Sequence, residues 1–526
     1  MKTIARVPFT EIESVPALIR DFLNDETVGF GDHLFTKENI QQKIQQKWKW
    51  FSVDQRKLIV EVLAEQNINS SASQRQNIEK LKQTNTYTVC TGHQLNLFTG
   101  PVFFVYKILQ TIKTAQFLSE ELPDAHFVPV FWMATEDHDF EEISFFKAFG
   151  NRYETTADGS GAVGRLQLSD RDFISRFTED FQGFPFADEL IKLIAEAYQK
   201  DHTLADATRF IVNKLFAEYG LLVLDGDDAR LKEQMKPIFR DELLNSSLQQ
   251  HSEKNVETLT QQYKKVQVNP REINLFYLEE GRNRIDRSEE GFQIADTEIF
   301  FSREQIVEIL EESPEKFSPN ALMRPVFQEM ILPNVAYIGG NAEIMYWLEL
   351  PDYFDYLNLP FPVMIPRSSF LMLSQKQEAK LERLDISVQQ LLSSVSKVQN
   401  VHVQRDNSLF SEIRALNERL SQQFDTLEQI SRKTDITFGN LVNAEKTRQL
   451  RSLERMEKRL LRAEKRKNTD LMDRIERIFA EIHPNGSWQE RQVNFSEFYL
   501  IHGKKWLETC LEEMDPFSPE LVTMVD

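Results

Sequence analysis

Residues 86–107 read TYTVCTGHQLNLFTGPVFFVYK, and this stretch decides the fold class. It begins with a β-branched run that is typical of a strand, and it continues through a turn that contains Gly92. Gly100 and Pro101 then open an apolar helix, where an early proline removes no hydrogen bond that the helix needs. The stretch therefore predicts a strand, a turn and a helix in succession.

A second stretch, residues 129–143, reads PVFWMATEDHDFEEI. A short apolar strand is followed at once by Glu136, Asp137, His138 and Asp139. Both stretches place polar groups where a strand ends, and ligands of open α/β sheets bind at the carboxyl ends of the strands. The pattern indicates a functional site rather than packing, so we expect an enzyme.

The rest of residues 85–225 alternates strand and helix signals. KLFAEYG at 214–220 and LLVLDGDD at 221–228 predict a helix, a glycine cap and a strand that ends in acidic residues. Such alternation implies βαβ units and a parallel sheet. Residues 1–83 are mostly helical by pattern. Residues 230–320 are mixed, which suggests an insertion or a second lobe.

The character of the sequence changes at residue 375. Apolar residues then recur at alternating spacings of three and four, which is typical of a coiled coil. These residues are Phe410, Ile413, Leu420, Phe424, Leu427 and Ile430, with Leu416 near the seam. We expect residues 375–482 to form antiparallel helices that project from a core of residues 1–374. The apolar tail, residues 483–526, is expected to dock back on that core.

The composition limits the partners and the location. The chain has 526 residues, a formal net charge of −20 and 41% hydrophobic residues. It can bury a large core, but it repels nucleic acid and anionic membranes at long range. Its cysteines, Cys90 and Cys510, make neither a disulfide framework nor an ordinary zinc site. No signal peptide and no membrane-spanning apolar run is evident. We expect a cytoplasmic protein without a nucleic-acid or membrane partner.

The turn after the first strand is a candidate anion site. Gly92, His93 and Gln94 precede the helix, and a helix start after such a turn offers unpaired N–H groups to phosphate or carboxylate. His93 would stabilise a phosphate or donate a proton near pH 7, and Lys107 lies two turns further along. An ordinary strand-turn-helix with a partly buried histidine explains these residues about as well. The stretch contains neither a P-loop nor a G-x-G-x-x-G motif.

The acidic turn at residues 136–139 suits three kinds of chemistry. A carboxylate there can bind an ammonium group, act as a general base or hold Mg²⁺, and one beside His138 can fix the tautomer of that ring. Adjacent residues of an extended segment point to opposite faces, so about two of them reach one site. A solvated acidic turn is the competing interpretation. As a zinc site the turn is weak, since it lacks an HExxH pattern and cysteine ligands.

Two later segments carry further candidates. Gly339 and Gly340 follow an apolar run and suggest a close approach of backbone to ligand. Arg324 has the planar fork that pairs with a carboxylate or a phosphate. The other candidates of this segment are Gln328, Tyr337, Asn341, Glu343, Tyr346 and Trp347, of which the last two are individually more typical of a core. Arg367 follows the strand FPVMIP, where a surface turn is nearly as good an explanation.

Three long motifs, in this order, resemble those of the cysteine ligases of bacillithiol biosynthesis, the BshC family. TGHQLNLFTGPVFFVYKI at 91–108 is similar to the family's TGQQ-x-x-LFTGP-x-x-x-x-YK segment. PVFWMATEDHDFEEI is similar to PVFW-x-x-x-EDHDF-x-E, and LMRPVFQEMILPNVAYIGGNAEIMYWLEL at 322–350 to LRP-x-x-Q-x-x-LLP-x-x-AY-x-GG-x-x-E-x-x-Y. The resemblance covers nearly the whole chain. It departs at His93, where the family commonly has glutamine, and at Asn341, where a Gly-Pro-Gly-like turn is usual.

The resemblance implies a Rossmann-like parallel sheet akin to class I aminoacyl-tRNA synthetases and nucleotidyltransferases, with connecting insertions and a helical coiled coil that forms a homodimer. It also implies a ligase that joins the carboxyl group of L-cysteine to the amine of glucosaminyl-malate in the last step of bacillithiol biosynthesis. Because a free carboxylate is a poor electrophile, such a fold favours activation by ATP as an acyl-adenylate. Mg²⁺ is compatible with this chemistry, and no tightly bound cofactor is expected.

Residue roles follow from this interpretation. The predicted catalytic residues are His93, Asp137, His138 and Arg367. His93 and Arg367 would stabilise phosphate charge, and Asp137 or Glu136 would bind an ammonium group or deprotonate the attacking amine. The predicted substrate-binding residues are Gly92, Gln94, Lys107, Glu136, Asp139, Arg324, Tyr337, Gly339, Gly340 and Glu343. Arg324 or Lys107 would meet the malate carboxylates, and no metal-ligand set is predicted.

Other interpretations remain open at this point. A nucleotidyltransferase that acts on another small anionic substrate would keep the same pocket. A metal-dependent hydrolase would use Asp137, His138 and Asp139 as ligands. A purely structural coiled-coil protein is disfavoured, because polar residues crowd several strand ends. Every enzymatic interpretation requires that the segments between residues 91 and 369 converge at one edge of the sheet.

Overall fold

The computed structural model describes residues 1–27, 29–156, 161–405, 407–431, 433 and 436–526. These residues divide into two compact units. The first unit consists of residues 1–372 and 489–524, and the second of residues 373–488 with 525–526. The chain thus leaves the first unit after residue 372 and returns to it at residue 489.

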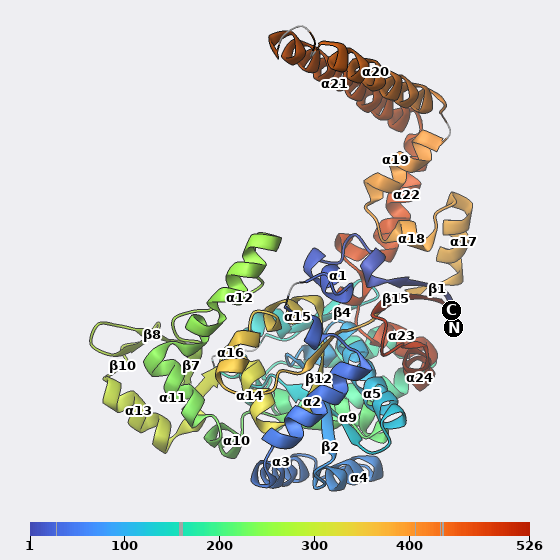
Figure 1. Cartoon of the computed structure of the whole chain (residues 1–526). Helices are drawn as coiled ribbons and strands as arrows, with labels where there is room; N and C mark the ends of the chain where they lie inside the picture. Colours follow the sequence, from blue (N-terminus) through green and yellow to red (C-terminus); the bar gives the residue numbers. More distant parts are fainter. Residues whose placement is uncertain (28, 157–160, 406, 432, 434–435) are drawn as a thin grey trace. The chain divides into compact units, whose positions relative to one another are not determined.

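A parallel sheet forms the centre of the first unit (Figure 1). In the described residues its strand order is β13 (Val363–Pro366), β12 (Asn334–Gly339), β2 (Thr86–His93), β3 (His126–Met133) and β6 (Leu222–Asp225), and each neighbouring pair is parallel. The strands are rich in buried β-branched and aromatic residues, as parallel strands covered on both faces require. The register aligns His93 with Met133 and Met133 with Asp225, so three carboxyl ends lie level. The predicted parallel α/β core is confirmed.

Helices pack against this sheet, with α2 on β12 and β13, α3 on β6, and α5 on β2 and β3. Ser52 and Ser71 begin α3 and α4 with capping boxes, in which serine and glutamine side chains satisfy backbone N–H groups that would otherwise lack partners. The helices of this part are α1 (Ala17–Leu23), α2 (Lys37–Trp50), α3 (Val53–Gln66), α4 (Ala72–Leu81), α5 (Phe103–Glu121), α6 (Phe140–Ile143), α7 (Asp172–Phe181), α8 (Ala187–Ala197), α9 (Leu204–Phe216), α14 (Met323–Ile331), α15 (Asn341–Trp347) and α16 (Pro351–Tyr356). A hairpin of β4 (Phe145–Ala148) and β5 (Asn151–Glu154) follows α6.

The loop between β2 and α5 differs from the sequence prediction. The helix begins at Phe103, later than Gly100, and residues 98–100 all have positive φ. The loop is buried, and the N–H of Val102 donates to the carbonyl of Val493 at 2.8 Å. The expectation that this helix start offers its N–H groups to an anion is therefore wrong, because the returning C-terminal segment covers it.

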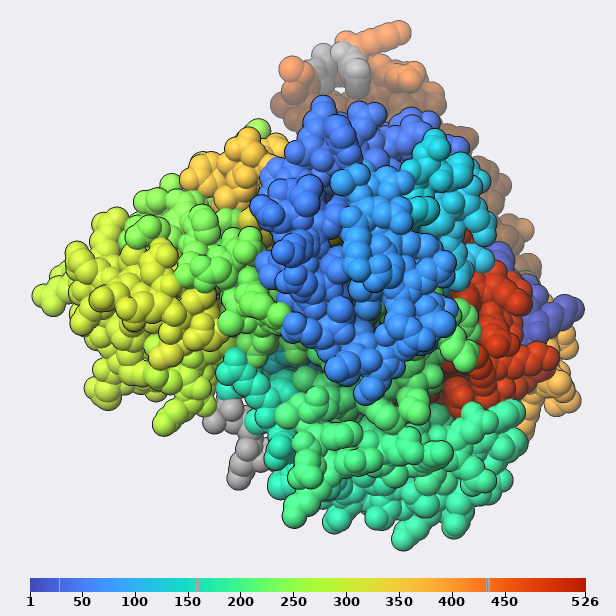
Figure 2. All heavy atoms as spheres, turned by 90° about the horizontal axis from the view of Figure 1, so that it is seen from below, coloured from blue at the N-terminus to red at the C-terminus, as the bar shows by residue number. Residues whose placement is uncertain are grey.

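An insertion separates β6 from β12. It contains α10 (Ala229–Glu233), α11 (Lys236–Asn245), α12 (Ser247–Tyr263) and α13 (Arg303–Glu312). Its antiparallel sheet has the order β10 (Phe300–Phe301), β9 (Phe292–Ile294), β8 (Arg282–Arg287), β7 (Leu275–Leu278) and β11 (Phe317–Pro319). Figure 2 shows the green and yellow-green atoms of this insertion as a lobe beside the blue N-terminal helices. The mixed pattern of residues 230–320 corresponds to this lobe.

The two ends of the chain meet in a further sheet of order β1 (Lys2–Pro8), β15 (Glu520–Val525) and β14 (Ser369–Leu373). The preceding helices, α23 (Ser496–His502) and α24 (Lys504–Glu513), lie in the first unit, where α24 contacts α5. The fully buried Trp506 has its ring centroid 6.1 Å from Tyr106 of α5 and 5.4 Å from Phe498. The returning segment therefore shares the core of the central sheet.

The second unit is helical. Its helices are α17 (Gln375–Leu384), α18 (Val388–Leu391), α19 (Val395–Arg405), α20 (Leu409–Ser431), α21 (Ile436–Lys467) and α22 (Thr469–Ile482). Arg414 pairs with Glu457 at 3.0 Å, and Asp425, later in α20, pairs with Lys446, earlier in α21. The two long helices are thus antiparallel, which confirms the predicted helical coiled coil. In the described part of the chain, no helix is long and apolar enough to cross a membrane.

Packing of the C-terminal segment on α5 is expected to contribute strongly to stability. Trp506→Ala removes a fully buried indole, and we expect it to lower the free energy of unfolding by about 3–5 kcal/mol. Trp48→Ala, whose side chain is 62% exposed, is the matched control and should change it by less than about 1 kcal/mol. Urea unfolding followed by circular dichroism measures both. Equal effects of the two variants would contradict the packing.

Candidate active site

The carboxyl edge of the central sheet borders a cleft of about 520 Å³. Its lining comes from the end of β2, the acidic turn after β3, Gly226 after β6, the helices α14 and α15, and the insertion. The sequence-predicted site residues that line it are Gly92, His93, Gln94, Glu136, Asp137, His138, Arg324, Tyr337 and Glu343. The structure therefore brings the β2 turn and the acidic turn to one cleft.

An ion pair between a buried lysine and a partly exposed, cleft-lining glutamate joins the β2 turn to α15. The ammonium group of Lys107, a residue of α5, lies 2.7 Å from one carboxylate oxygen of Glu343 and also donates to the carbonyl of Gly92. Glu343 accepts further bonds from the Tyr337 hydroxyl at 2.7 Å and the Gly340 N–H at 3.1 Å. Burial alone would raise the pKa of Glu343, but the charge and hydrogen bonds of Lys107 outweigh it and lower that pKa to about 2. Glu343 is thus ionised, and Lys107 is committed to it.

His93 is neutral at physiological pH. Burial, followed by the nearby charge of Lys107, lowers its pKa to about 4. Its Nδ1 lies 3.0 Å from the carbonyl oxygen of Gln94, and a carbonyl only accepts, so we place the ring proton on Nδ1. Nε2 then carries the lone pair. The expectation that His93 donates a proton near pH 7 is not supported by this environment.

The carboxylates of the acidic turn have different partners. Glu136 lies 2.5 Å from the buried ammonium group of Lys232, and the side chain of Asp139 caps α6 by accepting from the N–H of Glu142 at 3.3 Å. Asp137 accepts from the Gln94 side-chain amide at 2.7 Å, and its own side chain is 25% exposed. Asp137 also faces the cleft, and the Arg282 guanidinium lies 3.9 Å from it, much farther than Lys232 is from Glu136.

His138 joins the acidic turn to the insertion. Its Nδ1 accepts from the guanidinium of Arg282 at 2.8 Å, which requires a neutral ring with the proton on Nε2. The same guanidinium lies 4.0 Å above the ring of Phe276 and donates to the carbonyl of Pro319 at 2.8 Å. Burial and the charge of Arg282 lower the pKa of His138. This residue therefore holds two parts of the cleft wall together.

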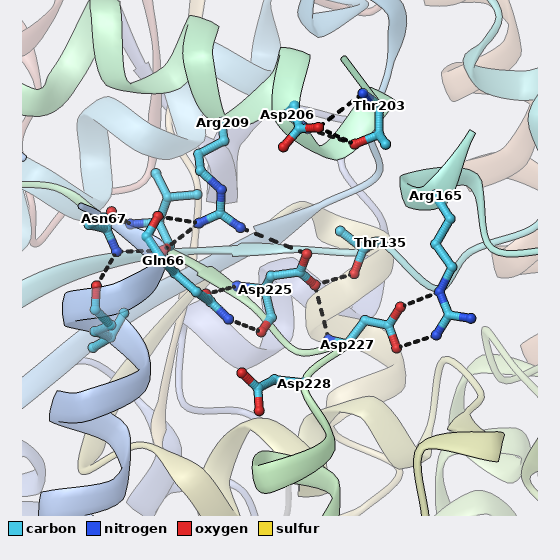
Figure 3. A network of polar contacts seen from close by, with 12 residues as sticks. Gln66, Asn67, Thr135, Arg165, Thr203, Asp206, Arg209, Asp225, Asp227 and Asp228 are labelled. Atoms are coloured by element: carbon cyan, nitrogen blue, oxygen red, sulfur yellow. Dashed lines mark hydrogen bonds and ion pairs between the residues drawn. The ribbon is translucent and has the colours of Figure 1, made fainter. Parts of the chain in front are cut away.

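A buried polar network fixes the end of β6 (Figure 3). The carboxylate of Asp225 accepts from the Thr135 hydroxyl and from the N–H of Asp227, the latter at 2.9 Å. The Gln66 side chain accepts from the N–H of Asp225 at 2.8 Å. The guanidinium of Arg165 donates two hydrogen bonds, of 2.8 and 2.9 Å, to the carboxylate of Asp227. These contacts hold Gly226 in place at the cleft, where a Cβ would lie 2.4 Å from the ring of Trp132.

Arg324 of α14 lies against the β2 turn. It donates to the hydroxyls of Tyr337 at 3.3 Å and Tyr346 at 3.2 Å. A Cβ at Gly92 would lie 3.4 Å from its Nη1, so glycine allows this close approach. Among the described residues, no carboxylate lies within 4.0 Å of its guanidinium nitrogens. Its charge therefore faces the cleft among neutral partners.

Other predicted residues support the cleft without lining it. Lys107, Asp139 and Gly340 make the contacts described above, and the carbonyl of Gly339 accepts from the N–H of Arg367 at 2.8 Å. Arg367 is 5% exposed and makes two bonds, of 2.7 and 2.8 Å, to the carboxylate of Glu490 from the returning segment. Its guanidinium lies 4.7 Å from the ring of Phe103. The structure therefore places Arg367 in the packing behind the site.

Sequence reasoning missed the residues that the insertion contributes. Arg271, Arg282, Arg284 and Asn320 line the cleft, and the three arginines lie outside the predicted motifs. The alternate arginines of GRNRIDR at 281–287 are a period-two signal, typical of a strand with one charged face, that would have pointed to two of them.

The metal-dependent alternative finds little support in the donor set. In the described ranges, no group of three or more His, Cys, Asp and Glu side chains is arranged to hold a metal ion. Of the proposed ligands, His138 uses its Nδ1 lone pair on Arg282, and Asp139 caps a helix.

Comparison with known proteins gives the family. Residues 5–368 match the family described as "Bacillithiol biosynthesis BshC, N-terminal Rossmann-like domain", and residues 370–524 match "Bacillithiol biosynthesis BshC, C-terminal coiled-coil domain". The chain belongs to the BshC family of bacillithiol biosynthesis. The parallel sheet of the first unit is thus the Rossmann-like domain of BshC, and α20 and α21 belong to its coiled-coil domain.

Curated BshC relatives match along nearly their whole length. A protein of Flavobacterium johnsoniae is 42% identical over 507 residues, which span 95% of this chain and 96% of that protein. One of Christiangramia forsetii is 39% identical over 522 residues, or 97% of both chains. One of Chlorobaculum tepidum is 28% identical over 502 residues, 90% of this chain and 89% of its own. Each of them is named "Putative cysteine ligase BshC".

The ionised state of Glu343 predicts how the stability of this BshC protein depends on pH. Its folded pKa of about 2 lies below the ordinary value of 4.5, so its contribution is complete above about pH 5 and is lost as the pH falls toward 2. Glu343→Gln should lower the free energy of unfolding by about 2–3 kcal/mol at pH 7, with a smaller difference from the unsubstituted protein at pH 4. Urea unfolding across this range measures it.

The exposed Glu120→Gln, on the same α5 helix as Lys107, is the matched control and should show no such pH-dependent difference. A Glu343→Gln difference that stays constant from pH 7 to pH 4 would mean that Glu343 is not held ionised by Lys107.

Proposed function

We propose that this protein is a ligase that joins the carboxyl group of L-cysteine to the amine of glucosaminyl-malate, the last step of bacillithiol biosynthesis. The observation that carries the proposal is the cleft at the carboxyl edge of the Rossmann-like sheet, where the Asp137 carboxylate and the Arg324 guanidinium face one space. The names of the curated relatives support the cysteine ligase part of the proposal.

The amine is assigned to the Asp137 side of the cleft. An amine attacks an acyl carbon only as the free base, so a carboxylate must first bind the ammonium form and then accept its proton. Asp137 is oriented for this by the Gln94 amide at 2.7 Å and by the N–H of His138 at 2.8 Å. Glu136 is less suitable, because the ammonium group of Lys232 lies 2.5 Å from it.

Activation of the cysteine carboxyl group by ATP, with Mg²⁺, remains part of the proposal. ATP would supply the leaving group that a free carboxylate lacks. Among the cleft residues, Arg324 is placed to offset negative charge on the activated group, since its guanidinium has only neutral partners. The predicted contributions of Arg367 and of the helix start near Gly100 find no support, because the C-terminal segment holds both.

Ligation is tested directly with purified protein. We expect cysteine and glucosaminyl-malate to give the amide in the presence of ATP and Mg²⁺, with little product when ATP is omitted, as mass spectrometry would show. Asp137→Asn should lower kcat by about 100-fold or more, because an amide cannot accept the proton of the amine.

The matched control is Glu141→Gln, an exposed residue of the same acidic segment that does not line the cleft. It should keep the activity of the unsubstituted protein. Product that forms equally well without ATP would remove ATP activation from the mechanism. A folded Asp137→Asn variant with full activity would remove Asp137.

We also propose that the coiled-coil unit pairs with a second copy of the chain. In the described residues, the α20–α21 hairpin leaves apolar side chains exposed: Leu416 and Leu427 at 45%, Met456 at 52% and Leu441 at 60%. Ile413, Leu420 and Phe424 are only half-buried by the hairpin itself. Exposed apolar surface of this kind is stabilised when another helix covers it.

Self-association is expected to depend on these apolar residues. Sedimentation or light scattering should give a dimer for the unsubstituted chain, whereas Leu427→Glu with Leu441→Glu should give a monomer that stays folded. Gln423→Glu introduces the same charge at an exposed polar position of α20 and should remain dimeric. A monomeric unsubstituted chain at micromolar concentration would rule the interface out.

A further inference from the structure

The insertion sheet presents a row of arginines to the cleft. Arg282 and Arg284 are two residues apart in β8, so their side chains leave the same face of the strand, and both line the cleft. Phe276 of β7 pairs with Arg284 across the sheet and lines the cleft beside it. Arg271, just before β7, adds a further guanidinium to this wall.

The guanidinium of Arg282 is fully engaged in contacts within the protein. Arg282 has only 8% of its side chain exposed and donates to the Ser318 hydroxyl at 3.0 Å, the Pro319 carbonyl at 2.8 Å and His138 at 2.8 Å. Its role is to join β8, β11 and the acidic turn. It thereby fixes the position of Arg284 on the same strand face.

Arg271 and Arg284 have no such commitment. Both residues are exposed, and in the part of the chain that the structure describes no carboxylate lies within 4.0 Å of their guanidinium nitrogens. Other arginines of the insertion are paired. Arg287 of the same strand lies 2.7 Å from Glu272, and Arg230 lies 2.8 Å from Asp228.

We propose that Arg271 and Arg284 form a dicarboxylate subsite that takes the malyl group of the amine substrate. The inference rests on the proposed function and names the residues that select its substrate. Planar guanidinium forks match carboxylates with paired hydrogen bonds, and guanidinium groups from separate elements suit a ligand with two separated carboxylates. With its carboxylates there, the substrate can present its amine to Asp137 in the same cleft.

A phosphate fits this wall less well than a carboxylate. Guanidinium groups bind phosphate as well as carboxylate, but many phosphate sites add free N–H groups at helix starts. The start of α14 is capped by Asn320, whose side-chain oxygen accepts from the N–H groups of Leu322 and Met323, each at 2.9 Å. The Gly340 N–H, at the start of α15, donates to Glu343. What remains for a ligand at this wall is guanidinium rather than backbone.

The subsite is tested by ligand binding to the full chain, with thermal unfolding as the readout. At equal ionic strength we expect L-malate to raise Tm more than L-lactate, because only malate has a second carboxylate for a second guanidinium. Arg284→Ala and Arg271→Ala should each lose most of the extra rise, and Arg284→Lys should restore part of it. Arg303→Ala, an exposed arginine of the same insertion outside the cleft, should keep it in full.

The ligation assay gives an independent readout. Arg284→Ala should raise KM for glucosaminyl-malate by about 10-fold to 100-fold while kcat stays within about twofold, since the lost contact acts on binding. Equal stabilisation by malate and lactate, or a malate effect that survives both alanine variants, would overturn the subsite. So would a loss, in these variants, of stabilisation by inorganic pyrophosphate rather than by malate.

Failure of this inference is distinguishable from failure of the proposed function. If no amide forms but the malate effect is lost in Arg284→Ala and kept in Arg303→Ala, the ligase proposal falls and the subsite stands. If amide forms with an unchanged KM in both alanine variants, the ligase stands and the subsite falls.

Discussion

The ion pair of the buried Lys107 with Glu343, which is largely buried at the cleft, is the interaction on which the geometry of the cleft depends. Removing an ammonium group and a carboxylate from water costs several kcal/mol each, and that cost is offset only when every hydrogen-bonding position is filled. Here Gly92, Tyr337 and Gly340 fill the remaining positions. The pair therefore ties together the end of β2, the middle of α5 and the start of α15, and the charge of Lys107 also helps to keep His93 neutral. Lys107 therefore keeps Glu343 ionised, and after burial it is the second cause of the lowered pKa of His93.

Two sheets of different kinds form the cleft, one parallel and one antiparallel. In the Rossmann-like sheet, the carboxyl ends of β2, β3 and β6 lie level in the parallel register. The acidic turn after β3 is therefore at the edge where ligands of such sheets bind. The insertion supplies an antiparallel wall whose alternate residues face one side. Arg282 is the contact that joins them, through a neutral His138. Because that contact needs an unprotonated Nδ1, the relative position of the acidic turn and the insertion wall is linked to the charge of a single imidazole.

The sequence predicts those parts of the fold that are decided by nearby residues. The strand before Gly92, the strand before Glu136 and the seam around Phe424 all follow from periodicity over ten to twenty residues. The roles of the loop at 97–100 and of Arg367 do not follow from the sequence, because their partners, Asn494 and Glu490, come from a segment more than a hundred residues away. No local pattern distinguishes a helix start that awaits an anion from one that a distant segment covers. The neutral state of His93 could not be predicted from nearby residues either, because burial and the charge of Lys107 produce it.

The distribution of charge within the cleft is what makes amide formation chemically reasonable there. The proposed ligase must hold the carboxyl group of cysteine and the two carboxylates of the malyl group. It must do so without binding the amine so tightly that the amine stays protonated. In this structure the lysines near the sheet edge are neutralised by Glu343 and Glu136, while the uncommitted cations are arginines. A guanidinium does not give up its proton at physiological pH, so it can bind substrate carboxylates without protonating the amine. Asp137, the cleft-facing carboxylate beside a neutral amide donor, is then left to receive the proton. The chemistry therefore requires cations that stay charged and a separate group that accepts the proton. The arginines and Asp137 meet these two requirements.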